Sequence, residues 1–327
     1  MTMPFFPLWV GRAILALAMP IASCATAQSW PQRPVRLVVP APAGSSLDVV
    51  ARTLSEKLWP LWKQSVIVEN KPGAGGLIGV DAAAKAAPDG HVLALGFNGP
   101  LAFAPFLYAR MPYDSKRDLA PVILTSIQPN VLAITATIPA RSVRMLVDWA
   151  RSQPRAVSYA SIGSGSSSHL AMELFVRRAA FAAVHVPYQG SPAAALSVSR
   201  GETQLLFAVA SGVMPQVQSG QLRLLAVTSE RRFEGLEDLP TLSESGYPGF
   251  VAEAWNGIVA PAATPSALVT RINADVLRVL SSDGVRERFR ALGMAAGGGT
   301  PAAFSTLIKS EMDRWGPVIR QVDIRIE

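Results

Sequence analysis

The sequence is poor in the residues that most often carry metal or thiol chemistry. Its 327 residues include one cysteine, Cys24, and three histidines, His91, His169 and His185. A single cysteine excludes an intrachain disulfide, and no cysteine or histidine cluster has the spacing of a zinc site. The H-E-x-x-H, G-x-S-x-G and P-loop motifs are absent as well. We therefore expect no cofactor, no metal and no thiolate catalysis.

Long apolar runs are also scarce, and the one near the N-terminus has the organisation of an export signal. Arg12 precedes a short apolar stretch at 13–19, and Ala25-Thr26-Ala27 matches the small-x-small pattern of a cleavage site. The apolar stretch is too short to span a bilayer. We expect residues 1–27 to be a signal peptide, removed on export to the periplasm. Lipidation at Cys24 is the alternative, which we favour less because the residues before it match a lipobox only loosely.

Charge is modest, with 16% charged residues and a formal net charge of +7. The basic residues are scattered, as Arg141, Arg144, Arg151 and Arg155 show, and no basic run or aromatic ladder is present. The pattern therefore argues against a nucleic-acid partner. A positive field would attract anionic solutes, although a generally solvated basic surface explains the charge equally well.

Two series of alternating strands and helices predict an α/β fold. Strands are expected at 35–40, 65–69 and 91–95, with helices from Leu47 and over 78–87 between them. A second series has strands at 156–160, 184–187, 205–209 and 222–227, and helices at 168–178 and 193–198. Three further helices are expected at 266–280, 283–292 and 301–318. Such alternation is typical of parallel sheets covered by helices.

The two series suggest two lobes with a cleft between them. We expect the chain to cross from one lobe to the other near 131–134 and to return near 251–254. Lobe 1 would then comprise residues 28–131 plus 252–327, and lobe 2 residues 132–251. Trp255, close to the return crossing, is a candidate for the cleft.

One serine-rich junction between a strand and a helix stands out in each lobe. The first contains Ser45 and Asp48, which have the spacing of a capping box. The second runs from Ser161 to His169 and is rich in glycine and serine. A helix N-terminus presents unpaired N–H groups and partial positive charge, so that two facing junctions could bind a carboxylate without an arginine. The simpler interpretation is that the serines only cap their own helices.

Other motifs are weaker. A secreted hydrolase that uses Ser166 or Ser168 with His169 is the alternative from another class of protein, but no nucleophile elbow supports it. The glycines of 73–76 lack the lysine and the hydroxyl residue of a P-loop and predict a structural turn.

A series of short motifs gives the chain a resemblance to the Bug/TctC periplasmic receptors of tripartite tricarboxylate transport. These motifs extend over essentially the whole chain after the signal peptide. They are Trp30-Pro31, residues 35–40, Asp48 with Ala51-Arg52, 68–76, 86–90, 111–114, 163–170, 185–190, 225–229 and Ala260-Pro261.

The resemblance implies a two-lobed, periplasmic-binding-protein (Venus flytrap) fold that holds a small carboxylate through backbone groups, hydroxyls and ordered waters. It adds Tyr188 and Gly190 to the candidate site. The expected ligand-binding residues are Pro42, Ala43, Gly44, Ser45, Ser46, Asp48, Gly163, Gly165, Ser166, Ser167, Ser168, His169, Tyr188, Gly190 and Ala208.

Some positions depart from the family pattern. Ser45 replaces a usual glycine, and Leu101, Ala104 and Ala208 stand where the family often has polar residues. If these positions line the cleft, the pocket is unusually apolar and the ligand is a monocarboxylate or an aromatic acid. We expect a monomer without enzymatic activity that delivers its ligand to membrane transporter subunits; a sensor that presents the ligand to a signalling ectodomain is the alternative.

Overall fold

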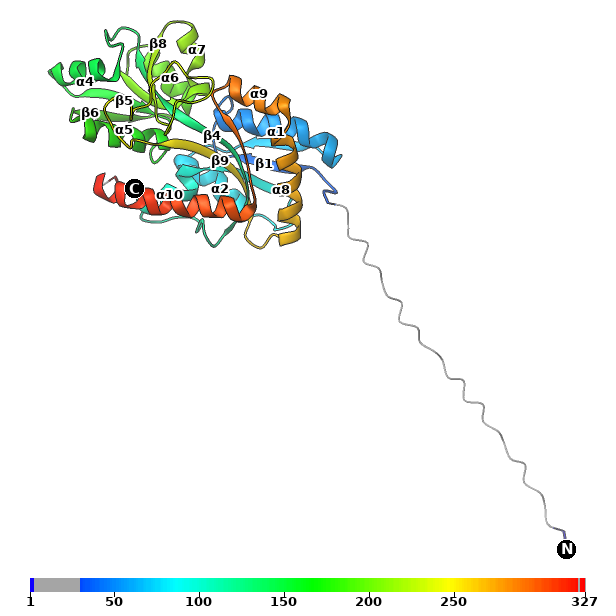
Figure 1. The fold of residues 1–327 in the computed structure, drawn as a ribbon. Helices are drawn as coiled ribbons and strands as arrows, with labels where there is room; N and C mark the ends of the chain where they lie inside the picture. Colours follow the sequence, from blue (N-terminus) through cyan, green and yellow to red (C-terminus); the bar gives the residue numbers. More distant parts are fainter. Residues whose placement is uncertain (3–29, 323, 327) are drawn as a thin grey trace.

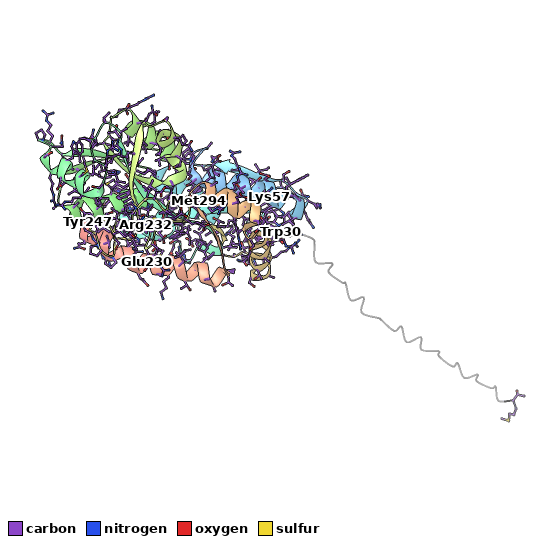
Figure 2. The ribbon with its side chains drawn as sticks, turned by 45° about the horizontal axis from the view of Figure 1, so that its top comes forward. Trp30, Lys57, Glu230, Arg232, Tyr247 and Met294 are labelled. Atoms are coloured by element: carbon purple, nitrogen blue, oxygen red, sulfur yellow. The ribbon has the colours of Figure 1, made fainter. Side chains whose placement is uncertain are left out.

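The computed structural model describes residues 1–2, 30–322 and 324–326. Apart from its first two residues, the expected signal peptide, with Cys24, lies outside the described residues. The described chain forms two lobes side by side, with helix α10 (Pro301–Val322) running along both (Figure 1). Trp30 and Tyr247 lie towards opposite ends of the molecule (Figure 2). No helix in the described ranges has both the length and the apolar character needed to cross a bilayer.

A single long strand, β4 (Leu119–Thr135), belongs to both lobes. In lobe 1 it pairs with two strands, β9 (Glu253–Pro261) and β10 (Ala295–Gly298), and the sheet continues in the order β9-β3-β1-β2. The other strands of this lobe are β1 (Val35–Val39), β2 (Val66–Asn70) and β3 (Val92–Phe97). In lobe 2, β4 pairs with β8 (Leu222–Val227) and β7 (Leu205–Val209), followed by β5 (Val157–Ser161) and β6 (Ala183–Pro187).

Helices cover both faces of each sheet. On one face of lobe 1, three helices enclose a core with the strands: α1 (Ser46–Trp62), α8 (Ser266–Leu280) and α9 (Asp283–Ala291). In lobe 2, α6 (Ser191–Ser199) and α7 (Met214–Gln218) pack on a smaller core. A third core extends through both lobes and includes α2 (Leu77–Ala84), α4 (Val143–Ser152), α5 (Ser167–Ala179) and α10. Because α10 contributes to this shared core, it links the lobes.

The positions of the expected strands and helices agree with the structure, but the prediction of parallel sheets is only partly right. β1, β2 and β3 are parallel, and so are β5, β6 and β7. β4, however, is antiparallel to β7, β8, β9 and β10, and β3 is antiparallel to β9. Strands that carry the chain from one lobe to the other must run in opposite directions, so the sheets are mixed.

Several elements are absent from the sequence-based expectations. They include α4, α7, β10 and a helical segment that comprises the π turn Gly99–Phe103 and α3 (Ala104–Leu107). The last of these follows β3 directly and is fully buried at its start, where Leu101 is 1% exposed. Its proline and alanine content gives no clear helical period.

The change of partner along β4 occurs at Pro129 and Asn130. Pro129 pairs with Glu253 of β9, whereas Asn130 pairs with Val209 of β7. A proline has no N–H for the sheet ladder, so a strand is readily redirected there. The Asn130 N–H instead bonds to the hydroxyl of Thr228 at 2.9 Å, and that hydroxyl donates to the carbonyl of Ala252 at 2.8 Å. The two crossings are thus tied together by side-chain hydrogen bonds.

Candidate functional site

A cavity of about 420 Å³ lies between the two lobes. Its walls come from loops after β1, β2 and β3, from the α5 and α6 N-termini, and from the middle of β4 and β9. The residues that line it are Pro40, Ala41, Pro42, Ser45, Ser46, Leu47, Pro72, Gly73, Ala74, Gly75, Gly76, Phe97, Asn98, Tyr108, Gln128, Ile162, Gly163, Ser164, Ser166, Ser167, Pro187, Tyr188, Gln189, Gly190, Ser191, Val209, Ala254, Asn256 and Ile326. None of these described residues carries a formal charge, so any anion held here depends on dipoles and hydrogen bonds.

The N-terminus of α1 forms the lobe 1 side of the site. Ser45 is the N-cap residue, and its hydroxyl accepts a hydrogen bond from the Asp48 N–H at 3.3 Å. The Asp48 carboxylate in turn accepts from the N–H of Gly44 at 3.0 Å. Gly44 has φ +78°, a conformation that favours glycine. The turn is therefore fixed by side-chain bonds from both of its ends.

The N-terminus of α5 repeats this arrangement in lobe 2. Ser166 is the N-cap residue and accepts from the His169 N–H at 3.3 Å, while Gly165, with φ +76°, donates its N–H to Nδ1 of His169 at 3.1 Å. In both turns the third residue after the N-cap serine accepts a bond from the glycine before it. Asp48 and His169 are thus equivalent in position and role.

Two backbone N–H groups at each helix start have no acceptor within the described chain. Among the described residues, no acceptor is bonded to the N–H groups of Ser46 and Leu47 in α1 or of Ser167 and Ser168 in α5. Such free N–H groups carry the positive end of the helix dipole. Ser46, Leu47 and Ser167 line the same cavity, so the donors of the two lobes converge on it.

Asp48 is charged and fully occupied by its own neighbours. Burial opposes its ionisation, but hydrogen bonds from Arg52, Gly44 and Asn70 outweigh it and lower the pKa of this carboxyl. The Arg52 Nε lies 2.9 Å and the Asn70 Nδ2 3.0 Å from its oxygens. Since Arg52 neutralises Asp48, the charge of this carboxylate does not repel an anion at the helix start.

His169 belongs to a buried stack with His185 and Tyr159. The two imidazole rings lie 3.8 Å apart with an angle of 13° between their planes, and Tyr159 stacks on His185 at 5.0 Å. Burial, and secondarily His185, lowers the pKa of His169 to about 3, and burial lowers the pKa of His185 to about 4. Both rings are therefore neutral near pH 7, and the stack holds the His169 ring where it accepts from Gly165 of the α5 turn.

Amides from the crossing strands complete the wall between the helix starts. Gln128 of β4 and Asn256 of β9 are each 1% exposed and line the cavity, as does Asn98 after β3. Asn256 donates to Ser126 at 2.9 Å, and Gln128 donates weakly to Ser46 at 3.5 Å. The side-chain oxygens of Gln128 and Asn98 have no partner among the described residues. These amides are therefore free to bond a ligand or a water.

The lobes touch each other on either side of the cavity. A β-carbon built on Gly190 of lobe 2 would lie 2.8 Å from Cγ of Pro42 of lobe 1. One built on Gly75 of lobe 1 would lie 2.9 Å from the carbonyl oxygen of Ser164 of lobe 2. Only glycine allows the two surfaces to approach so closely.

Eight of the fifteen expected ligand-binding residues line this cavity: Pro42, Ser45, Ser46, Gly163, Ser166, Ser167, Tyr188 and Gly190. The other seven do not line it: Ala43, Gly44, Asp48, Gly165, Ser168, His169 and Ala208. Gly44, Asp48, Gly165 and His169 hold the turns in shape, and the Ser168 hydroxyl donates to the carbonyl of Phe207. Ala208 pairs with Val131 in the sheet and is buried in the lobe 2 core.

Several residues that line the cavity were missed from the sequence. Gln128 and Asn256 lie inside strands, where their only signal is an amide in a mainly apolar segment. Residues 73–76, expected only as a turn, also line the cavity, with Ala74–Gly76 forming a 3-10 turn. Trp255, in contrast, faces away from it, because its indole packs on Phe304 and donates to Glu311.

Leu101 and Ala104, which stand where the family often has polar residues, do not line the cavity. Both side chains lie in the shared core and are at most 2% exposed. Neither they nor Ala208 are among its lining residues. These three positions therefore do not favour a monocarboxylate over another acid.

A serine–histidine catalytic pair at the α5 turn is not supported by the described contacts. The His169 ring accepts from Gly165, and no bond joins it to the hydroxyl of Ser166 or Ser168 in the described part of the chain. Ser161 does approach His185 Nε2, at 2.6 Å, but Ser161 is fully buried and does not line the cavity. A substrate in the cavity would not reach that serine.

Comparison with known proteins agrees with this geometry. The family model described as "Tripartite tricarboxylate transporter family receptor" matches residues 49–324. The chain is 37% identical to the UPF0065 protein of the tcbD-tcbE intergenic region of Pseudomonas sp. (strain P51), over 93% of this chain and 91% of that one.

Solved structures share the fold as well. The chain superposes on Rpa4515 of R. palustris with adipate at a TM-score of 0.88 and 34% identity, over 90% of this chain and 99% of that one. MatC of Rhodopseudomonas palustris with bound malate superposes with a TM-score of 0.83 and 29% identity, over 89% and 100% of the two chains. These likenesses confirm the two-lobed periplasmic-binding-protein fold. The chain belongs to the family of tripartite tricarboxylate transporter receptors.

Proposed function

We propose that this protein captures a small organic carboxylate between its lobes, outside the cytoplasmic membrane, and delivers it to the membrane subunits of a tripartite transporter. The observation that carries the proposal is the pair of helix N-termini, one from each lobe, whose free N–H groups meet at a single uncharged cavity. The family supports the transport role, and exported receptors of this kind work in the periplasm. We expect removal of residues 1–27 and a monomeric receptor with lobe 1 at 28–131 plus 252–327 and lobe 2 at 132–251.

The cavity favours an acid with an apolar middle. Pro42, Phe97, Ile162, Val209 and Ala254 provide an apolar lining between the donors. The N–H groups of one helix start suffice for a monocarboxylate, and the other helix start offers a place for another carboxylate. The relatives solved with adipate and malate hold dicarboxylates. An amino group, however, would find no carboxylate among the described lining residues, only the uncharged amide oxygens of Gln128 and Asn98, so amino acids should bind more weakly than the corresponding acids.

Proline substitutions at the helix starts test the donors directly. Ser46 and Ser167 are the first residues of α1 and α5, where proline removes one N–H but suits the helical conformation. We expect Ser46→Pro or Ser167→Pro to weaken carboxylate binding about tenfold or more, since each removes a hydrogen bond to a charged group. The Ser46→Ala variant separates the loss of the hydroxyl from that of the N–H. Asp283→Pro at the exposed start of α9 is the control for proline itself.

Binding would be measured by native mass spectrometry of freshly purified protein, followed by titration calorimetry. The calorimetric panel contains succinate, malate, adipate, hexanoate, benzoate and aspartate. The proposal predicts a copurified organic acid or a saturable enthalpy with at least one member other than aspartate. No binding across the panel, or unchanged affinity in both proline variants, would contradict it.

A further inference from the structure

We infer that Ile326, near the C-terminal end, forms one wall of the ligand cavity and limits the length of the acid that fits. The inference rests on the proposed function, because it concerns the same cavity. It assigns a role in ligand specificity to the segment 324–326. This segment lies more than a hundred residues along the chain from either serine-rich turn.

The backbone of this segment is fixed to lobe 1. The Ile326 N–H donates to the carbonyl of Leu107 at 2.9 Å, and Ile326 pairs with Tyr108 in a parallel bridge. The preceding helix α10 is anchored by Phe304, Met312 and Trp315, which are at most 2% exposed in the shared core. The position of Ile326 is therefore set by tertiary packing and by the Leu107 hydrogen bond.

The Ile326 side chain reaches across to lobe 2. A β-carbon built on Gly165 would lie 3.3 Å from Cδ1 of Ile326. Gly165 is the residue that donates to His169 in the α5 turn, so Ile326 packs beside the donors of lobe 2. Ile326 itself lines the cavity, together with Tyr108.

Neighbouring contacts close the same end. The Tyr108 hydroxyl would lie 3.1 Å from a β-carbon on Gly75, and Gly75 approaches Ser164 of lobe 2. An acid whose carboxylate sits at the α5 turn therefore meets Ile326 and Tyr108 as its chain lengthens in that direction. The branched side chain of Ile326 occupies volume that further methylene groups would need.

Two series of linear acids test this inference on the full mature chain. The dicarboxylates are succinate, adipate, suberate and sebacate, and the monocarboxylates are butyrate, hexanoate, octanoate and decanoate. Dissociation constants would be measured by calorimetry for the wild type, Ile326→Ala, Ile326→Val and Ile326→Trp. Ile324→Ala is the matched control, because Ile324 packs on the shared core but does not line the cavity.

Shortening the side chain should shift the preference towards longer acids. For Ile326→Ala we expect the affinity ratio of each acid to the next shorter one to rise roughly tenfold near the length limit, as burial of two further methylene groups implies. Ile326→Val should shift the ratio less and in the same direction, Ile326→Trp should favour shorter acids, and Ile324→Ala should leave the ratios unchanged.

The outcomes separate this inference from the function on which it rests. If the wild type binds either series but all Ile326 variants keep its length preference, the wall is elsewhere and the inference is overturned while the function stands. The same conclusion follows if Ile324→Ala shifts the preference as much as Ile326→Ala. If neither series binds to the wild type, the inference is overturned, while binding of malate or benzoate in the first panel would leave the function standing.

Discussion

Asp48 and His169 hold equivalent positions behind the two binding turns, but they differ in charge. Asp48 is an anion balanced by Arg52, whereas His169 is a neutral ring in a stack. Both accept a bond from the glycine before the N-cap serine, so both fix the direction of the free N–H groups. The binding turns thus gain the same geometry from different chemistry, and the two residues should respond differently to pH.

Substitution of Asp48 should weaken lobe 1 near neutral pH. In Asp48→Asn, Arg52 loses its partner and Gly44 donates to a weaker acceptor, so we expect the free energy of unfolding to fall by about 2 kcal/mol. Because the folded-state pKa of Asp48 is lowered, its contribution is present above the pKa of the unfolded state and is lost as the pH falls through the folded-state value. Urea unfolding at a series of pH values should show the difference between wild type and variant shrinking in acid.

Asp313→Asn is the control for that measurement, since Asp313 is exposed on α10. A loss of the same size in Asp313→Asn would show that general surface charge, not the bonded turn, is responsible. A difference for Asp48→Asn that does not depend on pH would show that the loss does not come from the ionised carboxylate.

The histidine stack should make lobe 2 sensitive to acid. The folded-state pKa values of His169 and His185 are lowered, so the unfolded chain binds protons that the folded chain does not as the pH falls below about 6.5. Stability contributed by the neutral rings is therefore full above that pH and declines below it. Between about pH 7 and pH 5 we expect a loss of about 2 kcal/mol from each ring, because both stay neutral in the folded chain over this range.

Chemical unfolding across this range, in wild type and in His169→Gln, tests the stack. A glutamine oxygen can still accept from Gly165, and it does not titrate, so the variant should lose less stability in acid. His91→Gln, in lobe 1, should keep the acid-dependent loss, because both stacked rings remain. If the free energy of unfolding falls equally with pH in wild type and His169→Gln, the acid sensitivity does not come from His169.

Only part of the site was visible in the sequence, and the reason is physical. The turns at Ser45 and Ser166 carry capping serines and glycines whose spacing is local, so six of their expected residues do line the cavity, and the resemblance added Tyr188 and Gly190. Gln128 and Asn256 become neighbours of these turns only because β4 and β9 pair across the crossing. Ile326 reaches the cavity through the packing of α10. No local pattern encodes such long-range pairing.

At the scale of elements, the fold was predictable where hydrophobic periodicity is local. The bounds of α8 follow its apolar spacing, and the early strands follow their β-branched residues. The direction of β4 and β9 was not predictable, because a strand's sequence does not state its neighbours. β4 belongs to the sheets of both lobes because its partner strand changes at Pro129. In the sequence alone, this proline indicates the end of a strand.

The hydrogen bonds of Thr228 link Asn130 of β4 to Ala252, just before β9, and should be important for stability. In Thr228→Val, the Asn130 N–H loses its buried partner, whereas the Ala252 carbonyl keeps the Asn130 side-chain amide, so we expect the free energy of unfolding to fall by about 2 kcal/mol. Thermal and urea unfolding would measure the loss. Thr306→Val, on the exposed face of α10 where the hydroxyl bonds to Ala302, should change stability by less than about 0.5 kcal/mol. Similar losses in both variants would exclude a special role for the crossing.

For the whole molecule, ligand capture depends on how closely the lobes approach. Pro42 of lobe 1 and Gly190 of lobe 2 meet beside the cavity, and a β-carbon at Gly190 would lie 2.8 Å from the Pro42 ring. The lobes form this contact only when they are together, so a side chain at Gly190 should oppose closure without touching the N-termini of α1 and α5. If the closed form becomes less favourable, the affinity of a ligand that binds the closed form falls by the same free energy.

Gly190→Ala should therefore weaken carboxylate binding about tenfold, if closure becomes less favourable by about 1.4 kcal/mol. Gly190 has φ +94°, so alanine also strains the backbone there. Gly201→Ala is matched for that strain, because Gly201 has φ +76° but nothing within 4 Å of a β-carbon. Only Gly190→Ala should lose affinity, and adding Pro42→Ala should restore part of it by removing the ring. Calorimetry gives the affinities, and X-ray scattering should show less compaction on ligand addition for Gly190→Ala than for wild type. Equal affinity in Gly190→Ala and Gly201→Ala would mean that this contact does not limit closure, and capture would then depend on the Gly75 side of the cavity.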